Sequence, residues 1–425
     1  MAASPADLLL AVLGALPGDV DVAVVRREPG QWVVGVDPEA RLVASGVEAL
    51  DRLDRLGGGW WAGWLAYDLG RAVERVERRR GDDLHLPDLS LARFDARLVV
   101  GPAGLRVEGD GPTRPLLAAI AGQARAGRGR GARRGGATGL GRQGPASFTS
   151  SLDRGEFQAR VEEIVDLVRA GECYQVNLTR RLTADSAADP VALFSALVRH
   201  HPAPHAALLR WGEAAVVSAS PERFLRRRGE TVETRPIKGT AGQRSVLVAS
   251  AKDRAENVMI TDLARNDLGR VSVPGSVAVP ALCAPEAHPG LWHLVSTVTG
   301  RLRSGIRTGA LVRATFPPAS VTGAPKPRVL QAIEDLEPVT RGVYCGAVGW
   351  IDDDAAALEL NVAIRTFQIV GGRTHLGVGG GVTFDSDPAA EWRETELKAA
   401  RLLAVAAGVA PLGAPLAGTK LVVPA

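Results

Sequence analysis

Residues 206–218 read AALLRWGEAAVVS. This segment contains two short apolar runs, Ala206–Arg210 and Ala214–Ser218, and each run predicts a strand. Helical periodicity appears elsewhere, for example over residues 151–170 and 252–268, where apolar side chains recur three and four positions apart. Because strands and helices are mixed along the chain without regular alternation, the sequence predicts an α+β fold with largely antiparallel sheets.

The segment TRPIKGTAGQ at residues 234–243 contains an informative lysine, Lys238. The chain has 51 basic residues, and only five of them are lysines. A chain so biased uses arginine wherever any positive charge will serve. A desolvated lysine can lose its proton and act as a nucleophile, whereas an arginine cannot. Lys238 follows an extended Arg-Pro-Ile and precedes a Gly-Thr turn, which favours a side chain that projects toward a ligand. The alternative at this point is an exposed lysine at a strand end.

The composition is typical of a soluble globular protein. The 425 residues are 46% hydrophobic and 23% charged, and a net charge of +4 gives no reason to expect general affinity for nucleic acid. Cys173, Cys283 and Cys345 lack metal-ligand spacing, which favours a reducing cytoplasm. The apolar stretch at 8–16 lacks a basic leader, and no uncharged run reaches about 18 residues, so we expect neither a signal peptide nor a membrane helix.

Composition divides the chain into four segments. Residues 1–120 are predicted to form an N-terminal α+β subregion, in which the Gly- and Trp-rich stretch 57–71 packs as core. Residues 121–148 are rich in Arg, Gly and Ala and lack apolar periodicity, so they are predicted to be a flexible linker, with an RNA-binding segment as the alternative. Residues 149–410 carry the motifs described below, and 411–425 are a C-terminal tail.

Two predicted helices carry paired carboxylates. Asp253 and Glu256 are three residues apart, as are Glu391 and Glu394, so each pair lies on one helix face. Two such faces brought together would offer oxygen ligands to Mg²⁺, which typically takes one or two protein carboxylates together with water and substrate oxygens. The alternative is a pair of solvated acidic faces, with Glu394 and Lys398 forming a surface ion pair.

Two further features favour anion binding. Gly379, Gly380 and Gly381 end a predicted strand, where backbone N–H groups can approach an anion closely. Arg365 ends the strand 360–364, where its guanidinium could hold a carboxylate through two hydrogen bonds. The structural alternatives are a β-bulge at the glycines and an internal ion pair for Arg365.

Ordered motifs extend from residue 174 to residue 398. They are YQVNL 174–178, SPE 220–222, PIKGT 236–240, ENVMITDLARNDLGR 256–270, HLVS 293–296, SVTGAPK 320–326, YCGAVG 344–349, IR 364–365 and DSDPAAEWRETELK 385–398. Together these motifs resemble those of the chorismate-utilising enzymes, a family that includes anthranilate, aminodeoxychorismate, isochorismate and salicylate synthases. In the first 120 residues only the stretch through Tyr67–Arg71 is similar.

The resemblance implies an anthranilate-synthase-like αββα sandwich of two large, mainly antiparallel sheets, with the active site between them. It also implies a magnesium ion that holds the ring carboxylate of chorismate. By motif position, Glu256 and Glu394 would bind this metal, and Asp253 and Glu391 would support it through water. Glu222 would be the general acid that protonates the departing 4-hydroxyl.

The same resemblance implies the remaining site residues. Arg365 and Tyr344 would hold the pyruvyl carboxylate of the substrate, helped by the glycines 379–381. Lys398 would lie near the ring carboxylate. His293 would be a further catalytic residue, and Ser320 and Gln175 would line the substrate.

Two positions separate branches of the family. Members that add water to chorismate carry a lysine where this chain has Gln175, so isochorismate and salicylate synthesis are disfavoured. Anthranilate synthases usually carry alanine in the Pro-Ile-x-Gly-Thr turn, whereas aminodeoxychorismate synthases carry lysine, here Lys238. The resemblance therefore implies the component I type of aminodeoxychorismate synthase. Such an enzyme aminates chorismate at C4 through a covalent Lys238 intermediate, for 4-aminobenzoate and folate synthesis. Anthranilate formation stays open, as does an inactive RNA- or partner-binding homologue.

No cysteine of the chain has the glycine-rich setting of a glutaminase nucleophile. Ammonia is therefore expected from a separate glutamine amidotransferase subunit, in a heterodimer. Neither nucleic acid nor a membrane is expected as a partner, and the expected location is cytoplasmic. The chain departs from the family pattern at Cys345, where glycine is usual, and at Pro317-Pro318-Ala319, which replaces a more glycine-rich run.

Overall fold

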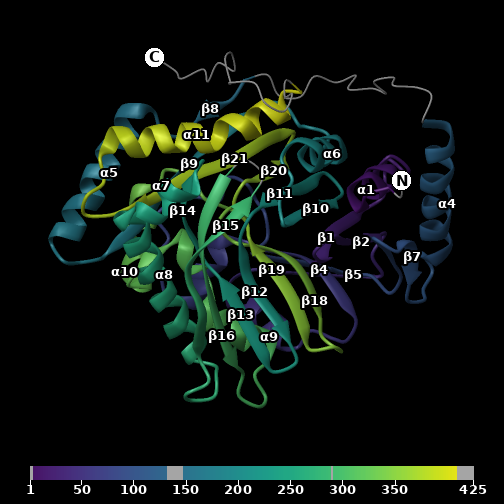
Figure 1. Ribbon diagram of the computed structural model, residues 1–425, viewed down its shortest axis with the longest axis horizontal. Helices are drawn as coiled ribbons and strands as arrows, with labels where there is room; N and C mark the ends of the chain where they lie inside the picture. Colours follow the sequence, from purple (N-terminus) through teal and green to yellow (C-terminus); the bar gives the residue numbers. More distant parts are fainter. Residues whose placement is uncertain (1–2, 132–146, 289–290, 409–425) are drawn as a thin grey trace.

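A computed structural model of the chain describes residues 3–131, 147–288 and 291–408. Two large antiparallel sheets stack against each other, and helices cover their outer faces (Figure 1). The predicted αββα sandwich is therefore confirmed.

The first sheet has 11 strands. In spatial order they are β17 (Gly323–Ala324), β9 (Gln175–Ala184), β21 (Arg373–Val382), β20 (Thr366–Val370), β11 (Ala214–Ser220), β10 (His205–Trp211), β1 (Val22–Glu28), β2 (Gln31–Val36), β6 (Arg97–Gly101) and β7 (Gly104–Glu108), and β8 (Thr149–Ser150) pairs with β9. Against its outer side lie α1 (Pro5–Leu13), α4 (Arg114–Gly131), α6 (Pro190–His200) and α11 (Pro388–Ala406), with α5 (Arg154–Arg169) packed on α11.

The second sheet has 10 strands. Their order is β14 (Ile237–Ala241), β16 (Leu291–Arg301), β13 (Thr231–Arg235), β12 (Arg223–Arg228), β19 (Ala357–Val362), β18 (Ala347–Asp352), β4 (Trp60–Leu65), β5 (Leu89–Arg93) and β3 (Ala40–Ala44), and β15 (Ala278–His288) pairs with β16. The helices of this side are α2 (Gly46–Asp54), α7 (Arg244–Ala249), α8 (Ala251–Gly269) and α9 (Thr308–Thr315). Helix α10 (Lys326–Leu336) contacts β9, and α3 (Gly70–Val73) and the single turns η1 (Tyr67–Leu69) and η2 (Ala319–Val321) complete the chain.

Tryptophans fill the space between the sheets, as the Gly- and Trp-rich stretch predicts. Trp60 stacks on Trp350 at a centroid distance of 6.4 Å, and Trp64 stacks on Trp211 at 6.3 Å. Strand β4, which carries Trp60 and Trp64, lies between β18 and β5 and is buried along its whole length. The rings therefore join strands of both sheets into one core.

The N-terminal segment belongs to both sheets. Strand β1 pairs with β10 of the first sheet, and β4 pairs with β18 of the second. The linker predicted over 121–148 begins inside α4, which continues to Gly131 because buried Leu117, Ile120, Ala121 and Ala124 give that helix an apolar face. Residues 132–146 and the predicted tail 411–425 lie outside the described residues.

Gly63 of β4 has no room for a side chain. A β-carbon built there would lie 1.9 Å from the carbonyl oxygen of Ser90 on the neighbouring strand. We expect Gly63→Ala to lower the free energy of unfolding by about 2 kcal/mol or more, because the backbone must move to relieve the clash. The matched control is Gly57→Ala, where nothing lies within 4 Å and a change within about 0.5 kcal/mol is expected. Urea unfolding measures both variants, and equal losses would contradict the packing argument.

Candidate active site

The predicted site residues meet where the ends of β9 and β21 approach β14 and helices α8 and α11. A lysine that the sequence analysis did not single out, Lys252, bridges the two acidic helices. Its Nζ lies 3.9 Å from Oε1 of Glu256 and 3.8 Å from Oε1 of Glu391. Ser250 and Asp387 accept backbone N–H groups at the N-termini of α8 and α11 and fix where each helix begins. The two acidic faces therefore lie together, a juxtaposition that the spacing of the carboxylates within each helix does not by itself predict.

Lys238 lies on β14, opposite Leu294 of β16. Burial lowers the pKa of its amine, and the positive charge of Lys398 adds to this effect, whereas the carboxylates of Glu256, Glu222 and Glu394 oppose it. The next residue, Gly239, has φ +75°, and a β-carbon there would lie 2.8 Å from Cβ of Asp253. Gly239 therefore permits both the bulge after Lys238 and the close approach of α8.

Glu222 is a buried carboxyl group, 3% exposed, that follows β11. Burial raises its pKa to about 7, against the opposing effects of the Ser320 hydroxyl, the backbone N–H of Ile237, and the charges of Lys238 and Arg365. The N–H of Ile237 donates to Oε1 of Glu222 at 3.4 Å. A carboxyl group with a pKa of about 7, that of Glu222, therefore hydrogen-bonds the residue that precedes Lys238.

The carboxylates of the two helices repel one another in a partly desolvated space. Burial raises the pKa of Glu256, and Asp253 and Glu394 add to the rise. Burial also raises the pKa of Glu391, whose Oε1 accepts a hydrogen bond from Ser386 Oγ at 2.8 Å. Within the described ranges, no three His, Cys, Asp or Glu side chains are grouped closely enough to hold a metal alone. Mg²⁺ needs only one or two protein carboxylates, so this donor set fits it.

Lys398 connects the glycine run to α11. Its Nζ donates to the carbonyl oxygen of Gly379 at 2.8 Å and pairs with Oε1 of Glu394 at 2.6 Å. Burial acts to raise the pKa of Glu394, but Lys398 outweighs it and holds that pKa below its ordinary value. A β-carbon on Gly380 would lie 3.3 Å from Oε2 of Glu391 and 3.5 Å from Oε1 of Glu394. The charged side chains of α11 therefore lie directly over Gly380.

Three predicted residues have buried polar atoms without partners among the described residues. They are both amide atoms of Gln175, Nε2 of His293 and the hydroxyl of Ser320. A β-carbon on Gly381 would lie 2.8 Å from the Gln175 side chain. Nδ1 of His293 bonds Thr240 Oγ1 at 2.9 Å, and burial, with the charge of Arg365, lowers the pKa of His293 to about 4. Buried polar atoms of this kind are suited to contact a polar ligand.

Arg365 has a strained backbone, and its side chain has no hydrogen-bonded or ion-pair partner among the described residues. Its φ is +52°, a left-handed conformation that is uncommon outside glycine. No hydrogen bond or ion pair of its guanidinium is found in the described part of the chain. Its charge lowers the pKa of both His293 and Glu222, which places it near these two residues. Arg365 is therefore available to a carboxylate from outside the chain.

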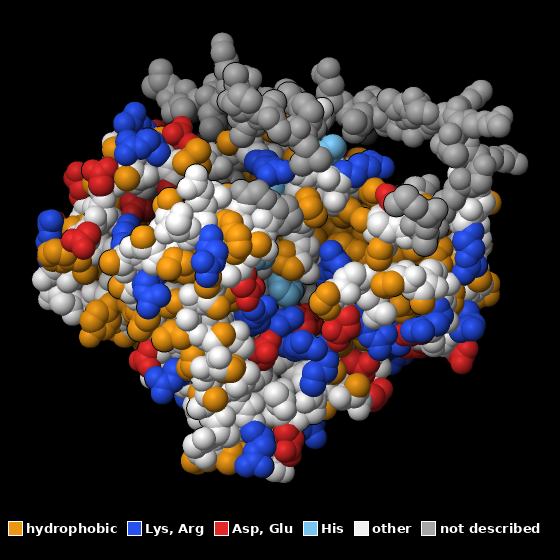
Figure 2. Space-filling view, in the orientation of Figure 1, with side chains coloured by type: hydrophobic (Ala, Val, Ile, Leu, Met, Phe, Trp, Pro, Cys, Tyr) orange, Lys and Arg blue, Asp and Glu red, His pale blue; other side chains and the backbone are white. Residues whose placement is uncertain are grey.

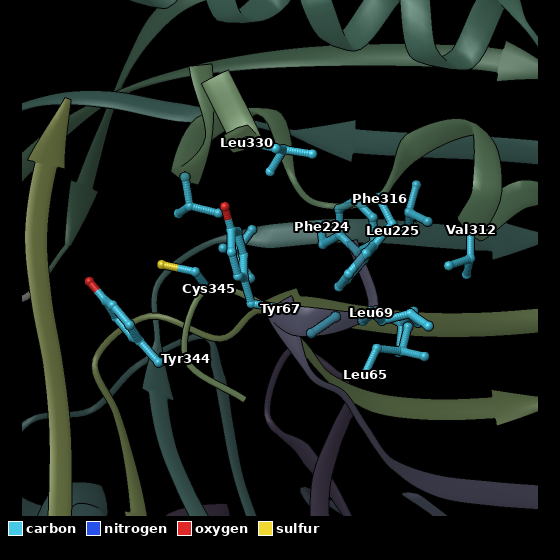
Figure 3. Packing of buried hydrophobic residues seen from close by; sticks show 14 of the residues in the cluster. Leu65, Tyr67, Leu69, Phe224, Leu225, Val312, Phe316, Leu330, Tyr344 and Cys345 are labelled. Carbon is cyan, nitrogen blue, oxygen red and sulfur yellow. The ribbon is translucent and has the colours of Figure 1, made fainter. Parts of the chain in front are cut away.

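Tyr344 belongs to the hydrophobic core. It is 6% exposed, and Figure 3 shows it in the core with Cys345 and Tyr67. Its ring contacts Gly377, two residues before Gly379 on β21. The predicted role of Tyr344 at the substrate stays a prediction. Cys345 has φ +66°, which explains why glycine is usual at this position.

Lys252 could have been found from the sequence. Lysine is rare in this chain, and Lys252 lies four residues before Glu256, which is the spacing of a helical ion pair.

The face shown in Figure 2 mixes basic and acidic side chains, with both signs gathered around a histidine near its centre. Among the described residues, no helix has both the length and the apolar character needed to cross a bilayer.

A family model described as "chorismate binding enzyme" matches residues 23–404. The chain belongs to this family. The predicted resemblance is thereby confirmed, and it extends well into the N-terminal segment. This chorismate-binding enzyme is 38% identical over 360 residues to aminodeoxychorismate synthase component 1 of Klebsiella aerogenes, covering 80% of the chain and 76% of the relative. It is also 38% identical over 359 residues to an anthranilate synthase component 1 of Haloarcula marismortui, covering 78% and 73%.

Solved structures support the fold of this chorismate-binding enzyme. Anthranilate synthase component I of Streptococcus pneumoniae superposes with a TM-score of 0.75 at 24% identity, covering 89% of the chain and 93% of that structure. The menaquinone-specific isochorismate synthase of Escherichia coli gives a TM-score of 0.70 at 20% identity, covering 93% and 91%. The sandwich is therefore shared by proteins whose names give different reactions, and the reaction of this chain must be inferred from the site.

Proposed function

We propose that this chorismate-binding enzyme aminates chorismate at C4 with ammonia and forms 4-amino-4-deoxychorismate, as component I of an aminodeoxychorismate synthase. The observation that carries the proposal is the position of Lys238, whose amine has a lowered pKa and lies among Glu222, Glu256 and Glu394. Relatives named aminodeoxychorismate synthase component 1, at 36% to 38% identity, support it.

The reaction would proceed in two displacements on the ring. Neutral Lys238 forms a bond to C2, the ring double bonds shift, and the C4–O bond breaks as Glu222 donates its proton, so that water leaves. Ammonia then forms a bond to C4, the double bonds shift back, and Lys238 departs from C2 as a neutral amine. The new C4 ammonium returns a proton to the Glu222 carboxylate, which balances protons over the cycle.

The remaining residues would bind and orient the substrate. The guanidinium of Arg365 would hold the pyruvyl carboxylate, with Tyr344 and the glycines 379–381 beside it. Lys398 would lie near the ring carboxylate, and Gln175, His293 and Ser320 would contact other polar groups. Glu256 and Glu394, supported by Asp253 and Glu391, would hold Mg²⁺, which when bound neutralises that ring carboxylate.

A second component would supply the ammonia. The relatives' designation as component 1 supports a separate glutamine amidotransferase subunit. The product would serve 4-aminobenzoate and folate synthesis. The three cysteines are free and buried, which agrees with a cytoplasmic location.

Anthranilate synthesis is the second candidate, because the relative from Haloarcula marismortui is equally similar in sequence. It would share the binding residues, but it requires pyruvate to be eliminated. Lysine at position 238 favours the first candidate, since a nucleophile at C2 is needed only when the amino group goes to C4.

The test is a product assay by mass spectrometry with purified protein, chorismate, ammonium and Mg²⁺. Aminodeoxychorismate should form, and chelation of the metal or Glu256→Gln should reduce its formation strongly because the metal loses a carboxylate ligand. Anthranilate with pyruvate would refute C4 amination and support the second candidate. No turnover, with Mg²⁺ shown to bind, would favour a non-catalytic homologue.

A further inference from the structure

Arg341 is a buried arginine that no part of the reaction above uses. It is 3% exposed and precedes the loop that carries Tyr344. We infer that Arg341 is a positioning residue, which holds three separate segments of the site in register through a single guanidinium. The inference rests on the proposed function for its kinetic readout but not for its binding readout.

The guanidinium contacts three segments. Its Nη1 donates to the carbonyl oxygen of Val321 at 2.9 Å, and its Nη2 donates to that of Asn177 at 2.7 Å. Nε and Nη2 also donate to the two carboxylate oxygens of Glu337, at 3.0 and 2.6 Å. An arginine is suited to this task because its five donors lie in one rigid plane.

The two carbonyl contacts lie within two residues of predicted substrate-binding residues. Val321 follows Ser320 in η2. Asn177 lies two residues after Gln175 on β9 and pairs with Gly381 of β21. Arg341 therefore holds backbone carbonyl groups close in sequence to the Ser320 hydroxyl and the Gln175 amide, which have no hydrogen-bond partner among the described residues.

Glu337 extends this set of contacts to the glycine run. Its Oε1 accepts hydrogen bonds from the backbone N–H and the hydroxyl of Thr179, at 2.8 and 2.9 Å. Thr179 pairs with Gly379, whose carbonyl oxygen accepts from Lys398. The ion pair thus reaches the strand that faces the metal-binding helix.

The N-terminal motif at Tyr67–Arg71 packs against Arg341 and the loop that follows it. The Arg341 guanidinium lies 4.3 Å from the centroid of the Tyr67 ring. Asp68 Oδ2 accepts the N–H of Gly342 at 3.0 Å, and Gln368 Oε1 accepts that of Val343 at 2.7 Å. The N-terminal motif that the sequence analysis identified therefore contacts both Arg341 and the loop that follows it.

A buried ion pair contributes little net stability, because desolvation of both charges offsets their attraction. Its replacement by neutral groups of similar size is often tolerated by the fold. Misplacement of a binding group by about 1 Å, in contrast, can cost about 100-fold in rate. The function of Arg341 should therefore be visible in substrate binding and turnover more than in stability.

The decisive variant is the double substitution Arg341→Met/Glu337→Gln, which removes both buried charges and keeps an acceptor for Thr179. We expect it to remain folded, with a Tm within a few degrees of the wild type. The apparent Kd for chorismate, measured by calorimetry with Mg²⁺, should rise by about 10-fold or more, and kcat/KM should fall by about 100-fold. The Arg341→Lys variant keeps one charge but cannot reach all three carbonyl and carboxylate partners. Its Kd and kcat/KM should therefore lie between those of the wild type and those of the double variant.

The control is Arg313→Met, because Arg313 is partly buried and pairs with Asp51 and Asp54 of α2 at 2.5 Å each, yet none of these contacts involves Glu337 or a predicted site residue. Its kcat/KM should stay within about 3-fold of the wild type whatever its Tm. The inference is overturned if the folded double variant binds and turns over chorismate as the wild type does, or if Arg313→Met loses as much. A wild type that binds chorismate but makes no aminodeoxychorismate would refute the proposed function alone, since the Kd comparison still tests Arg341.

Discussion

Lys238→Ala is expected to lower kcat for aminodeoxychorismate formation by about 1,000-fold or more. The substitution removes the atom that would bond to C2, and loss of a covalent nucleophile is among the costliest changes an enzyme can suffer. Lys238→Arg should be nearly as inactive, because a guanidinium keeps its proton and cannot attack. The measurement is steady-state product formation with ammonium, which bypasses any glutaminase subunit.

The matched control is Lys252→Ala. Lys252 lies near the same carboxylates, 3.9 Å from Glu256, but its side chain is 52% exposed and belongs to α8, not β14. The Lys252→Ala substitution should change the KM for chorismate, or the Mg²⁺ concentration needed for activity, by no more than about 10-fold. The reason is that Lys252 contributes only its charge. Comparable losses from both lysines would show that general electrostatics, not nucleophilic attack, explains the effect at position 238.

Glu222→Gln is expected to lower kcat/KM by about 100- to 10,000-fold, the range in which general acid catalysis contributes. Glutamine keeps the size of the side chain and can still accept from the Ile237 N–H, but it has no acidic proton to give the departing hydroxyl. Glu230→Gln, at an exposed position in the turn after β12, is the control and should change the rate by less than about 2-fold.

The pH profile separates the two groups. The pKa of Glu222 is raised to about 7, so its acidic form predominates below neutral pH and is lost above it. The pKa of Lys238 is lowered, so its neutral form increases as pH rises. Wild-type kcat/KM should therefore pass through a maximum, and its decline above about pH 7 should follow the titration of Glu222. Residual activity of Glu222→Gln should lack that decline, and an unchanged alkaline limb would assign it to another group.

Some of the site could be predicted because local spacing determines it. Acidic residues three apart on α8 and α11 must share a helix face whatever the tertiary fold, so the proximity of Glu256 and Glu394 required only that the helices meet. The rarity of lysine identified Lys238 in the same local way. Helix α4 also has a local sequence signal, since its apolar residues recur at helical spacing, but its Arg- and Gly-rich composition obscured that periodicity.

Other features depend on contacts between residues far apart in sequence. Nothing in the sequence of β1 indicates that it pairs with β10, because the register is set by the packing of both sheets. The contacts of Arg341 with Val321 and Asn177 go to backbone carbonyl groups, which carry no signature of residue type. The position of the Tyr344 ring likewise depends on the missing side chain at Gly377, on β21.

The interleaving of N-terminal strands into both sheets also limits how this enzyme can be recombined with its relatives. An exchange of everything before the Arg/Gly-rich segment would replace one partner in the β1–β10 and β4–β18 pairs, and it would replace Tyr67 beneath Arg341. A chimera joined there would have to match a core and a substrate-positioning loop that were selected with other partners. The segments before and after the Arg/Gly-rich stretch are therefore expected to work only when both come from the same protein. Chimeras that fold and function are expected to be joined in exposed hairpin turns within a sheet, and not at the apparent boundary between the two segments.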